Sequence, residues 1–398
     1  MSTLVERFGI QPGQFWLYGR RPERPVMFDE QTGAWNVYGY REVLDVLGDP
    51  GLFSSETARL LPMGVDESFT EGDLLQMDPP DHRELRSLVS HAFTPKVVAD
   101  LEPRITALTH ELLDAVAGKD QFDLMTSLAY PLPVTVVAEL LGIPAEDRAH
   151  MERWMSGIVS DMGDLSLGDS VEEQERTFDA AMVHMRQMTD YLREHAAACR
   201  RSPKDDLLGR LVRAEVAGRR LTDNHIVNFG KMLLIAGYLT TTMLIGNTAL
   251  CLDAHPEQAA RVRADRSLIP GLVEESMRYL TPVAATYRAT TTEAEFAGQK
   301  FQPNQMVMVW FSAANRDPRQ FADPDVFDLT RDPNPHLGFG RGIHFCLGSP
   351  LARMEARVAF NLLFDRFPAL MLDPDASPTF MAAPDTTGVT SLPVRVPA

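Results

Sequence analysis

Cys346 is the residue of this chain best placed to do chemistry. It follows Gly340 and Gly342, which can take positive φ and allow a tight turn, and Gly348 and Pro350 lead from it into a helical pattern. Free N–H groups and the dipole at the start of that helix favour a thiolate. Such a thiolate is a good axial ligand for haem iron. For a lone cysteine, the alternative is a small buried side chain beside a glycine-rich turn.

A second candidate group lies in the helix predicted after the paired prolines at 79–80. His82 and Arg86 are four residues apart and therefore share one helical face. Two such donors can clamp a carboxylate or a pair of carboxylates. The alternative is a solvated basic helix face.

A run of hydroxyl groups lies in the middle of an uncharged stretch at residues 232–252. Gly237 costs a helix about 1 kcal/mol relative to Ala, which indicates that it leaves room for a neighbour. Thr240 and Thr241 follow it, and hydroxyls that bond back to carbonyls can bend a helix. The alternative is a threonine-rich packing seam.

The same stretch is long enough to cross a membrane, with twenty-one residues and no charge. Its four threonines, two glycines and one asparagine favour a buried core helix instead. We therefore predict a helix over 223–252, with Thr222 as its N-cap, and no membrane span.

Glu275 and Arg278 are three residues apart and hence neighbours on one helical face. Taken alone this pair is a weak signal, because such pairs occur on most solvated helices. Strand patterns follow it at 282–288, which contains Arg288, and at 306–311.

The elements that position these groups are mostly helical by their periodicity. Besides 223–252, the predicted helices cover 97–117, 133–141, 145–159, 171–199 and 205–217. The first 50 residues predict a small sheet with a helix near 40–47, and residues 386–396 predict a closing hairpin. Residues 54–76 and 159–171 show little periodicity and predict a recognition loop and a mobile lid.

Amino-acid composition limits the class of protein and the kinds of partner that this chain can have. The chain has 398 residues, 44% of them hydrophobic and 23% charged, which is typical of a globular protein with a large core. Its formal net charge of −17 argues against a nucleic-acid or anionic-membrane partner. Three cysteines without CxxC spacing indicate a reducing compartment. The first twenty residues lack an apolar signal region, so we expect a cytoplasmic protein.

The cysteine run resembles the Phe-Gly-x-Gly-x-His-x-Cys-x-Gly signature of the cytochrome P450 haem-thiolate monooxygenases. Every fixed position is filled, by Phe339, Gly340, Gly342, His344, Cys346 and Gly348. The resemblance implies a mainly α fold with a small β region, in one triangular domain over 1–398. Its parts would be a β-rich start at about 1–50, a helical core at about 77–280 and a haem-ligand loop at 336–348.

The resemblance also implies roles for individual residues. Cys346 would ligate the iron of haem b (iron protoporphyrin IX), and Phe339 would shield the sulfur within a loop shaped by Gly340 and Gly348. The haem propionates would be held by His82, Arg86, Arg288 and His344. A buried structural triad would consist of Glu275, Arg278 and Arg331.

The hydroxyl run resembles the family's Ala-Gly-x-acid-Thr motif for oxygen activation in three of four fixed places. Gly237, Thr240 and Thr241 would serve this catalytic side of the haem. Leu239 stands where Asp or Glu is usual, so the usual proton carrier is missing.

The family's chemistry is monooxygenation with O₂ and two electrons, which would hydroxylate or epoxidise a small apolar or amphipathic molecule. The chain looks most like tailoring oxidases of bacterial secondary metabolism, including macrolide polyketides; fatty acids, terpenoids and steroids stay open as substrates. Specificity would lie in segments 54–76, 155–185, 282–287 and 386–394. A haem-thiolate protein without monooxygenase activity, such as a recruitment partner, isomerase or dehydratase, is the alternative.

Electrons would come from a small acidic ferredoxin and its NAD(P)H-dependent reductase, and we expect a monomer. The ferredoxin would meet a basic surface on the cysteine side, formed by Arg83, Lys96, Arg341, Arg353 and Arg357.

Overall fold

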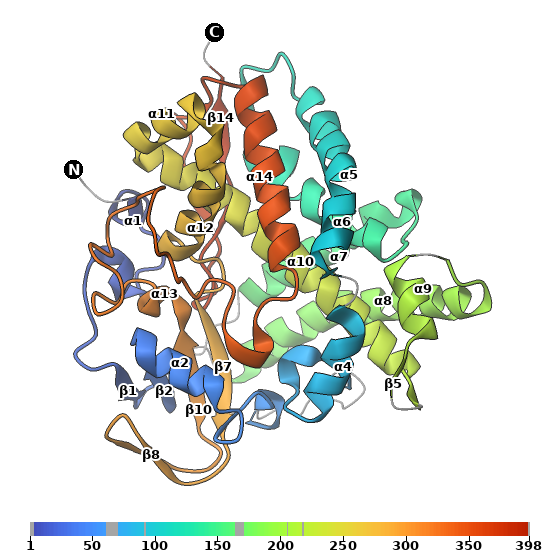
Figure 1. Cartoon of the computed structure of the whole chain (residues 1–398), viewed down its shortest axis with the longest axis vertical. Helices are drawn as coiled ribbons and strands as arrows, with labels where there is room; N and C mark the ends of the chain where they lie inside the picture. Colours follow the sequence, from blue (N-terminus) through green and yellow to red (C-terminus); the bar gives the residue numbers. More distant parts are fainter. Residues whose placement is uncertain are drawn as a thin grey trace.

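Helices dominate the computed structural model, which describes residues 4–60, 71–90, 93–163, 171–204, 206–216 and 219–396. Figure 1 shows α10 crossing the middle of the molecule, with α14 and α5 standing beside each other. The helices are α1 (Leu4–Phe8), α2 (Tyr40–Gly48), α4 (Asp81–Ser90), α5 (Pro95–Asp114), α6 (Pro131–Leu140), α7 (Arg148–Gly163), α8 (Val171–Arg201), α9 (Leu207–Arg213), α10 (Asp223–Ala254), α11 (Pro256–Ala264), α12 (Ile269–Tyr279), α13 (Phe311–Ala314) and α14 (Ser349–Arg366). The predicted mainly helical fold is confirmed.

The long helix α10 is the centre of the core. Thr222 caps it as predicted, because its Oγ1 accepts a hydrogen bond from the N–H of His225 at 3.1 Å. The helix packs against α6, α8, α12 and α14. By length and composition it could cross a membrane, but 61% of its most apolar window is buried inside the fold, as in a core helix.

A five-stranded sheet joins the start of the chain to the region after α12 (Figure 1). Its order is β1 (Val26–Asp29), β2 (Ala34–Val37), β10 (Met306–Trp310), β7 (Ala285–Thr290) and β3 (Phe53–Ser54). All neighbours are antiparallel except β2 and β10. The predicted N-terminal sheet is therefore real, but most of its partners come from far along the chain. Two short hairpins, β5–β6 (Glu215–Val216, Arg219–Arg220) and β8–β9 (Ala294–Phe296, Gln299–Phe301), stand apart.

The predicted closing hairpin at 386–396 is wrong. β13 (Val389–Ser391) pairs with β12 (Thr379–Phe380), whereas β14 (Pro393–Arg395) lies between β11 (Met371–Leu372) and β4 (Gln121–Asp123). Only Leu392 separates the two strands, and a hairpin normally needs a loop of at least two residues. The Leu392 N–H instead donates to the Asp123 carboxylate at 2.9 Å.

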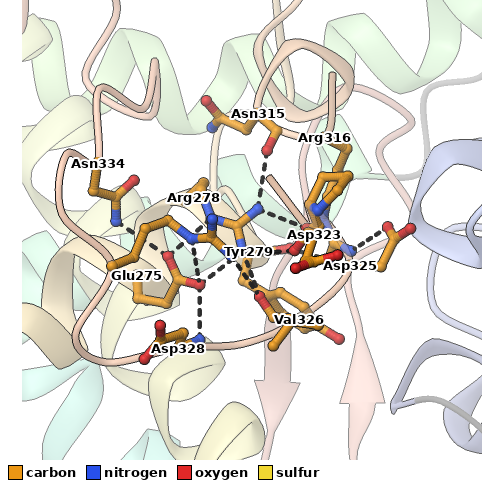
Figure 2. A network of polar contacts seen from close by, with 12 residues as sticks. Glu275, Arg278, Tyr279, Asn315, Arg316, Asp323, Asp325, Val326, Asp328 and Asn334 are labelled. Carbon is orange, nitrogen blue, oxygen red and sulfur yellow. Dashed lines mark hydrogen bonds and ion pairs between the residues drawn. The ribbon is translucent and has the colours of Figure 1, made fainter. Parts of the chain in front are cut away.

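Glu275 and Arg278 form a buried ion pair on α12 (Figure 2). The arginine donates from Nε to Oε2 at 2.8 Å and from Nη2 to Oε1 at 2.7 Å, and both side chains have no exposed surface. Arg331 Nε adds a bond to Oε1 at 3.3 Å. The backbone N–H of Asp328 and the amide of Asn334 also donate to this carboxylate, at 2.9 and 3.1 Å.

Asn315 links this network to the cysteine loop. Its carbonyl accepts from Arg278 Nη1 at 3.1 Å, and its side-chain Oδ1 accepts from the N–H of Leu337 at 2.7 Å. Leu337 lies nine residues before Cys346. The network therefore fixes the path of the chain into that loop.

We predict that Glu275→Ala strands the buried Arg278 charge and lowers the free energy of unfolding by about 3–5 kcal/mol. The expected result is little soluble haem-loaded protein, measured as the ratio of haem to protein and by thermal unfolding. Glu257→Ala, on the exposed start of α11, is the control and should change neither. A Glu275→Ala protein that folds, takes up haem and merely turns over slowly would show that this residue is catalytic.

Candidate active site

The loop around Cys346 is shaped by glycines and closed by α14. Gly340 and Gly342 have φ of +68° and +73°, as the sequence predicts. A Cβ atom at Gly342 would also lie 2.9 Å from the carbonyl oxygen of Leu47, which leaves no room for a side chain. The Cys346 N–H donates to the Phe339 carbonyl at 2.9 Å, and α14 begins three residues later.

The charge state of Cys346 reflects two opposed effects. Burial raises the pKa of the thiol, whereas backbone N–H groups of Gly348 and Ser349 and the charges of Arg86 and Arg353 lower it. Burial outweighs them, so the net pKa is raised. The start of a helix is thus insufficient to ionise this thiol; a bound iron would supply the missing stabilisation, since a metal deprotonates its thiol ligand.

Phe339, whose carbonyl bonds the Cys346 N–H, has a cation over its ring. It is nearly buried, and the Arg353 guanidinium lies 4.3 Å from the centre of its ring. Glu274 holds this arginine with bonds of 2.6 and 2.8 Å, and His336 lies 3.0 Å from the same carboxylate. Burial opposes ionisation of Glu274, but these hydrogen bonds outweigh it and bring its pKa to about 2.

Two of the five predicted basic surface residues are consequently neutralised by partners. Arg353 is paired with Glu274, and Arg357 is paired with Glu102 at 2.8 Å. The exposed members are Arg83, Lys96 and Arg341. The basic surface is smaller than the sequence predicts.

The four residues predicted to bind propionates gather at one edge of the cysteine loop. His82 is 1% exposed, and its ring lies 4.4 Å from that of His344. Arg288, on β7, is nearly buried, and Arg86 on α4 donates to the carbonyl of Phe345, next to the cysteine.

Positive charge at this edge, from Arg86 and Arg288, is only partly balanced by the protein, through Asp78. Burial and the nearby charges of Arg288 and His82 lower the pKa of His344 to about 3. Burial likewise lowers the pKa of Arg288 to about 10, with Asp78 as the carboxylate that opposes the shift. His82 Nε2 is buried and makes no hydrogen bond among the described residues. Such a cluster requires an anionic partner.

Haem meets this requirement. It carries two carboxylates at one edge, which the cationic cluster can bind, and an iron that the Cys346 sulfur can ligate. Within the described residues, no group of three or more His, Cys, Asp or Glu side chains could hold a bare metal ion. The donor set therefore fits a cofactor with one protein ligand.

The hydroxyl run on α10 divides between the core and the open side of the helix. Thr240 is partly exposed, and its Oγ1 donates to the Ala236 carbonyl at 2.7 Å, the predicted back-bond. Thr241 is only 4% exposed and faces the core. A Cβ at Gly237 would lie 2.8 Å from Cγ2 of Val137, so this glycine permits close packing of α6.

Comparison with known proteins agrees with this geometry. The family model described as Cytochrome P450 matches residues 26–396. The chain is 45% identical over 354 residues to the cyclomarin C epoxidase CymV of Salinispora arenicola, covering 88% of each protein. It is 42% identical over 364 residues to the erythromycin C-12 hydroxylase of Saccharopolyspora erythraea, covering 90% of this chain and 88% of the relative. A crystal structure of the hydroxylase HmtN matches over 100% of both chains, with 69% identity and a TM-score of 0.91.

The site and fold thus define a haem-thiolate monooxygenase. The chain belongs to the cytochrome P450 family, uses haem iron, acts on a small molecule and needs redox partners. Of the predicted specificity segments, 282–287 and 386–394 are described by the structure. Residues 61–70 of the first predicted loop and 164–170 of the predicted lid lie outside the described residues.

We predict that the reduced protein under carbon monoxide shows the far red-shifted Soret band of thiolate-ligated haem. Cys346→His should abolish this band, because the band depends on the sulfur ligand. Cys199→Ser, a buried cysteine on α8, is the control and should keep it. Persistence of the band in Cys346→His would mean that another residue binds the iron.

Proposed function

We propose that this enzyme hydroxylates or epoxidises a secondary metabolite, either a macrolide or a compound related to cyclomarin C. The observation that supports haem chemistry is the partly balanced cationic edge beside Cys346. The substrate class is supported by relatives that include a cyclomarin C epoxidase and an erythromycin hydroxylase. HmtN, 69% identical, is described as a post-tailoring hydroxylase of himastatin biosynthesis.

In this proposal haem b supplies the oxygen-activating chemistry, and the chain's own residues bind and orient it. Cys346 ligates the iron, while His82, Arg86, Arg288 and His344 hold the propionates. Phe339, with Arg353 over its ring, keeps water from the sulfur. Glu275 and its partners have a structural role.

Thr240 has a defined hydrogen-bonding role on the oxygen side. A hydroxyl has one hydrogen and two lone pairs, and this hydrogen goes to the Ala236 carbonyl. Its oxygen is therefore left to accept a hydrogen bond from a water or a substrate hydroxyl. Leu239 can neither donate nor accept a proton, so protons must reach the site through the molecule that Thr240 holds. Thr241, facing the core, has no part in this step, and Gly237 contributes only backbone.

The redox partner in this proposal is a small acidic ferredoxin, reduced by an NAD(P)H-dependent reductase in the cytoplasm. Arg83, Lys96 and Arg341 attract it to the cysteine side, and the enzyme acts as a monomer. Steering by so few exposed charges weakens with salt.

The function is tested by supplying NADPH, a surrogate ferredoxin and its reductase to the purified enzyme. Cyclomarin C, macrolides, a fatty acid and a steroid would be screened for the spectral shift caused by displacement of iron-bound water, and products read by mass spectrometry. A product carrying one added oxygen from cyclomarin C or a macrolide is the expected result. Turnover of the fatty acid or steroid alone would overturn the substrate class.

We predict that Thr240→Val diverts NADPH consumption to hydrogen peroxide with a turned-over substrate, because the proton-carrying molecule loses its acceptor. Thr248→Val is a matched control, since that threonine makes the same back-bond, to Leu244 at 2.7 Å, two turns further along α10. Leu239→Glu should be tolerated. Peroxide yield per NADPH is the measurement, and an unchanged yield in Thr240→Val would assign this threonine to packing only.

A further inference from the structure

Gln14 joins the N-terminal segment to a distant part of the chain through a buried hydrogen-bond network. It immediately precedes the short helix η1 (Phe15–Tyr18) and is 1% exposed. Its Nε2 donates to the Pro384 carbonyl and to Thr387 Oγ1, both at 3.0 Å. Its Oε1 accepts from Ser312 Oγ at 3.3 Å and from Thr387 Oγ1 at 3.2 Å.

The network holds two segments that already bind each other, 282–287 and 384–388, which we call the distal wall. The N–H of Ala284 donates to the Asp385 carbonyl and that of Thr387 to the Pro282 carbonyl, both at 2.8 Å. The Tyr287 hydroxyl donates to the Asp385 carboxylate at 2.8 Å. Gln14 bonds the 384–388 segment directly, and it reaches the 282–287 segment through Ser312, whose Oγ lies 3.2 Å from the Ala284 carbonyl.

The distal wall stands against the oxygen side of α10. Asn247 Nδ2 donates to the Thr387 carbonyl at 2.8 Å. A Cβ at Gly388 would lie 2.4 Å from Cγ of Met243, which is three residues beyond Thr240. At its other end the wall runs into Arg288 of the cationic edge. It therefore spans the side of the site between Thr240 and the proposed propionate cluster.

A neighbouring glutamine reinforces this arrangement. Gln11 Nε2 lies 2.8–2.9 Å from the carbonyls of Met381, Ala383 and Thr386. Two amides from the first fifteen residues thus bond four carbonyls of one turn. The turn's position therefore depends on these amides.

We propose that Gln14 is a positioning residue that sets the distal wall and thereby the fit of ligands that extend beyond the iron. This inference rests on the proposed function, because it takes the Thr240 side of α10 as the substrate side. Leucine has nearly the same size as glutamine but neither donates nor accepts, so Gln14→Leu frees the wall without opening a large cavity.

The experiment compares two azoles that ligate haem iron, 4-phenylimidazole and imidazole, by titration of the Soret band of the holoenzyme. The phenyl group of 4-phenylimidazole extends beyond the ring that ligates iron, whereas imidazole consists of that ring alone. For Gln14→Leu we expect the Kd of 4-phenylimidazole to rise about tenfold, as for the loss of one or two buried hydrogen bonds. The Kd of imidazole should stay within twofold, and the carbon monoxide band should be unchanged.

A second variant keeps the test decisive if Gln14→Leu fails to fold. Thr387→Val removes the hydroxyl that bonds Gln14 but keeps both backbone bonds of Thr387. It should raise the 4-phenylimidazole Kd in the same direction. Thr109→Val is the control, since it removes a fully buried hydroxyl bonded to Ile105 at 2.7 Å on α5, and it should leave both azoles unaffected.

Three outcomes would overturn the assignment of Gln14. One is 4-phenylimidazole binding within twofold of wild type in both variants. Another is a parallel loss of imidazole affinity, which would indicate damage to the haem site as a whole, and the third is an equal loss in Thr109→Val. A wild-type protein without a thiolate-type carbon monoxide band would instead refute the proposed function, and this inference with it.

Discussion

Burial of positive charge beside Cys346 is the constraint on which the site depends. Arg288 is almost completely buried, and burial lowers the pKa of both His82 and His344, which favours their neutral forms. Taking such groups out of water without partners is costly. An anionic cofactor removes this cost, so its binding free energy adds directly to the stability of the folded state. The cluster thus couples the assembly of the site to the presence of haem.

Local signals were enough to predict the parts of the site that are contiguous in sequence. The turn glycines, the helix that follows Cys346 and the Thr222 cap depend on neighbouring residues, and the structure has each of them. The helices of the core were likewise visible in their periodicity, usually to within a few residues.

Features that depend on distant partners could not be read from the sequence. The pairing of Arg353 with Glu274 is set by packing of α14 on α12, and the separation of β13 from β14 is set by sheets built elsewhere. Whether Thr240 or Thr241 faces the open side depends on the rotation of α10 in its surroundings. Gln14 carries no motif at all, and its partner lies 373 residues away.

Leu239 changes how the oxygen side works. Without a carboxylate next to Thr240, the helix offers one acceptor oxygen and an apolar side chain. In the proposed mechanism the substrate and its ordered water become part of the proton supply, which would link binding geometry to coupling. Such a mechanism needs a precisely placed substrate, and the distal wall, positioned by the amides of Gln11 and Gln14, is consistent with that need.

The contacts between the two ends of the chain also bear on how the protein is made. Gln14 can bond Thr387 only after 373 more residues have been made, and β4 can pair with β14 only after residues 393–395 exist. Such long-range pairings slow folding, because loop closure must precede any reward from contact. At about 5–20 residues per second, the ribosome completes the central helices long before their covering strands exist. A nascent chain therefore carries an unfinished pocket until these strands are made, and cofactor capture belongs to the period after that point.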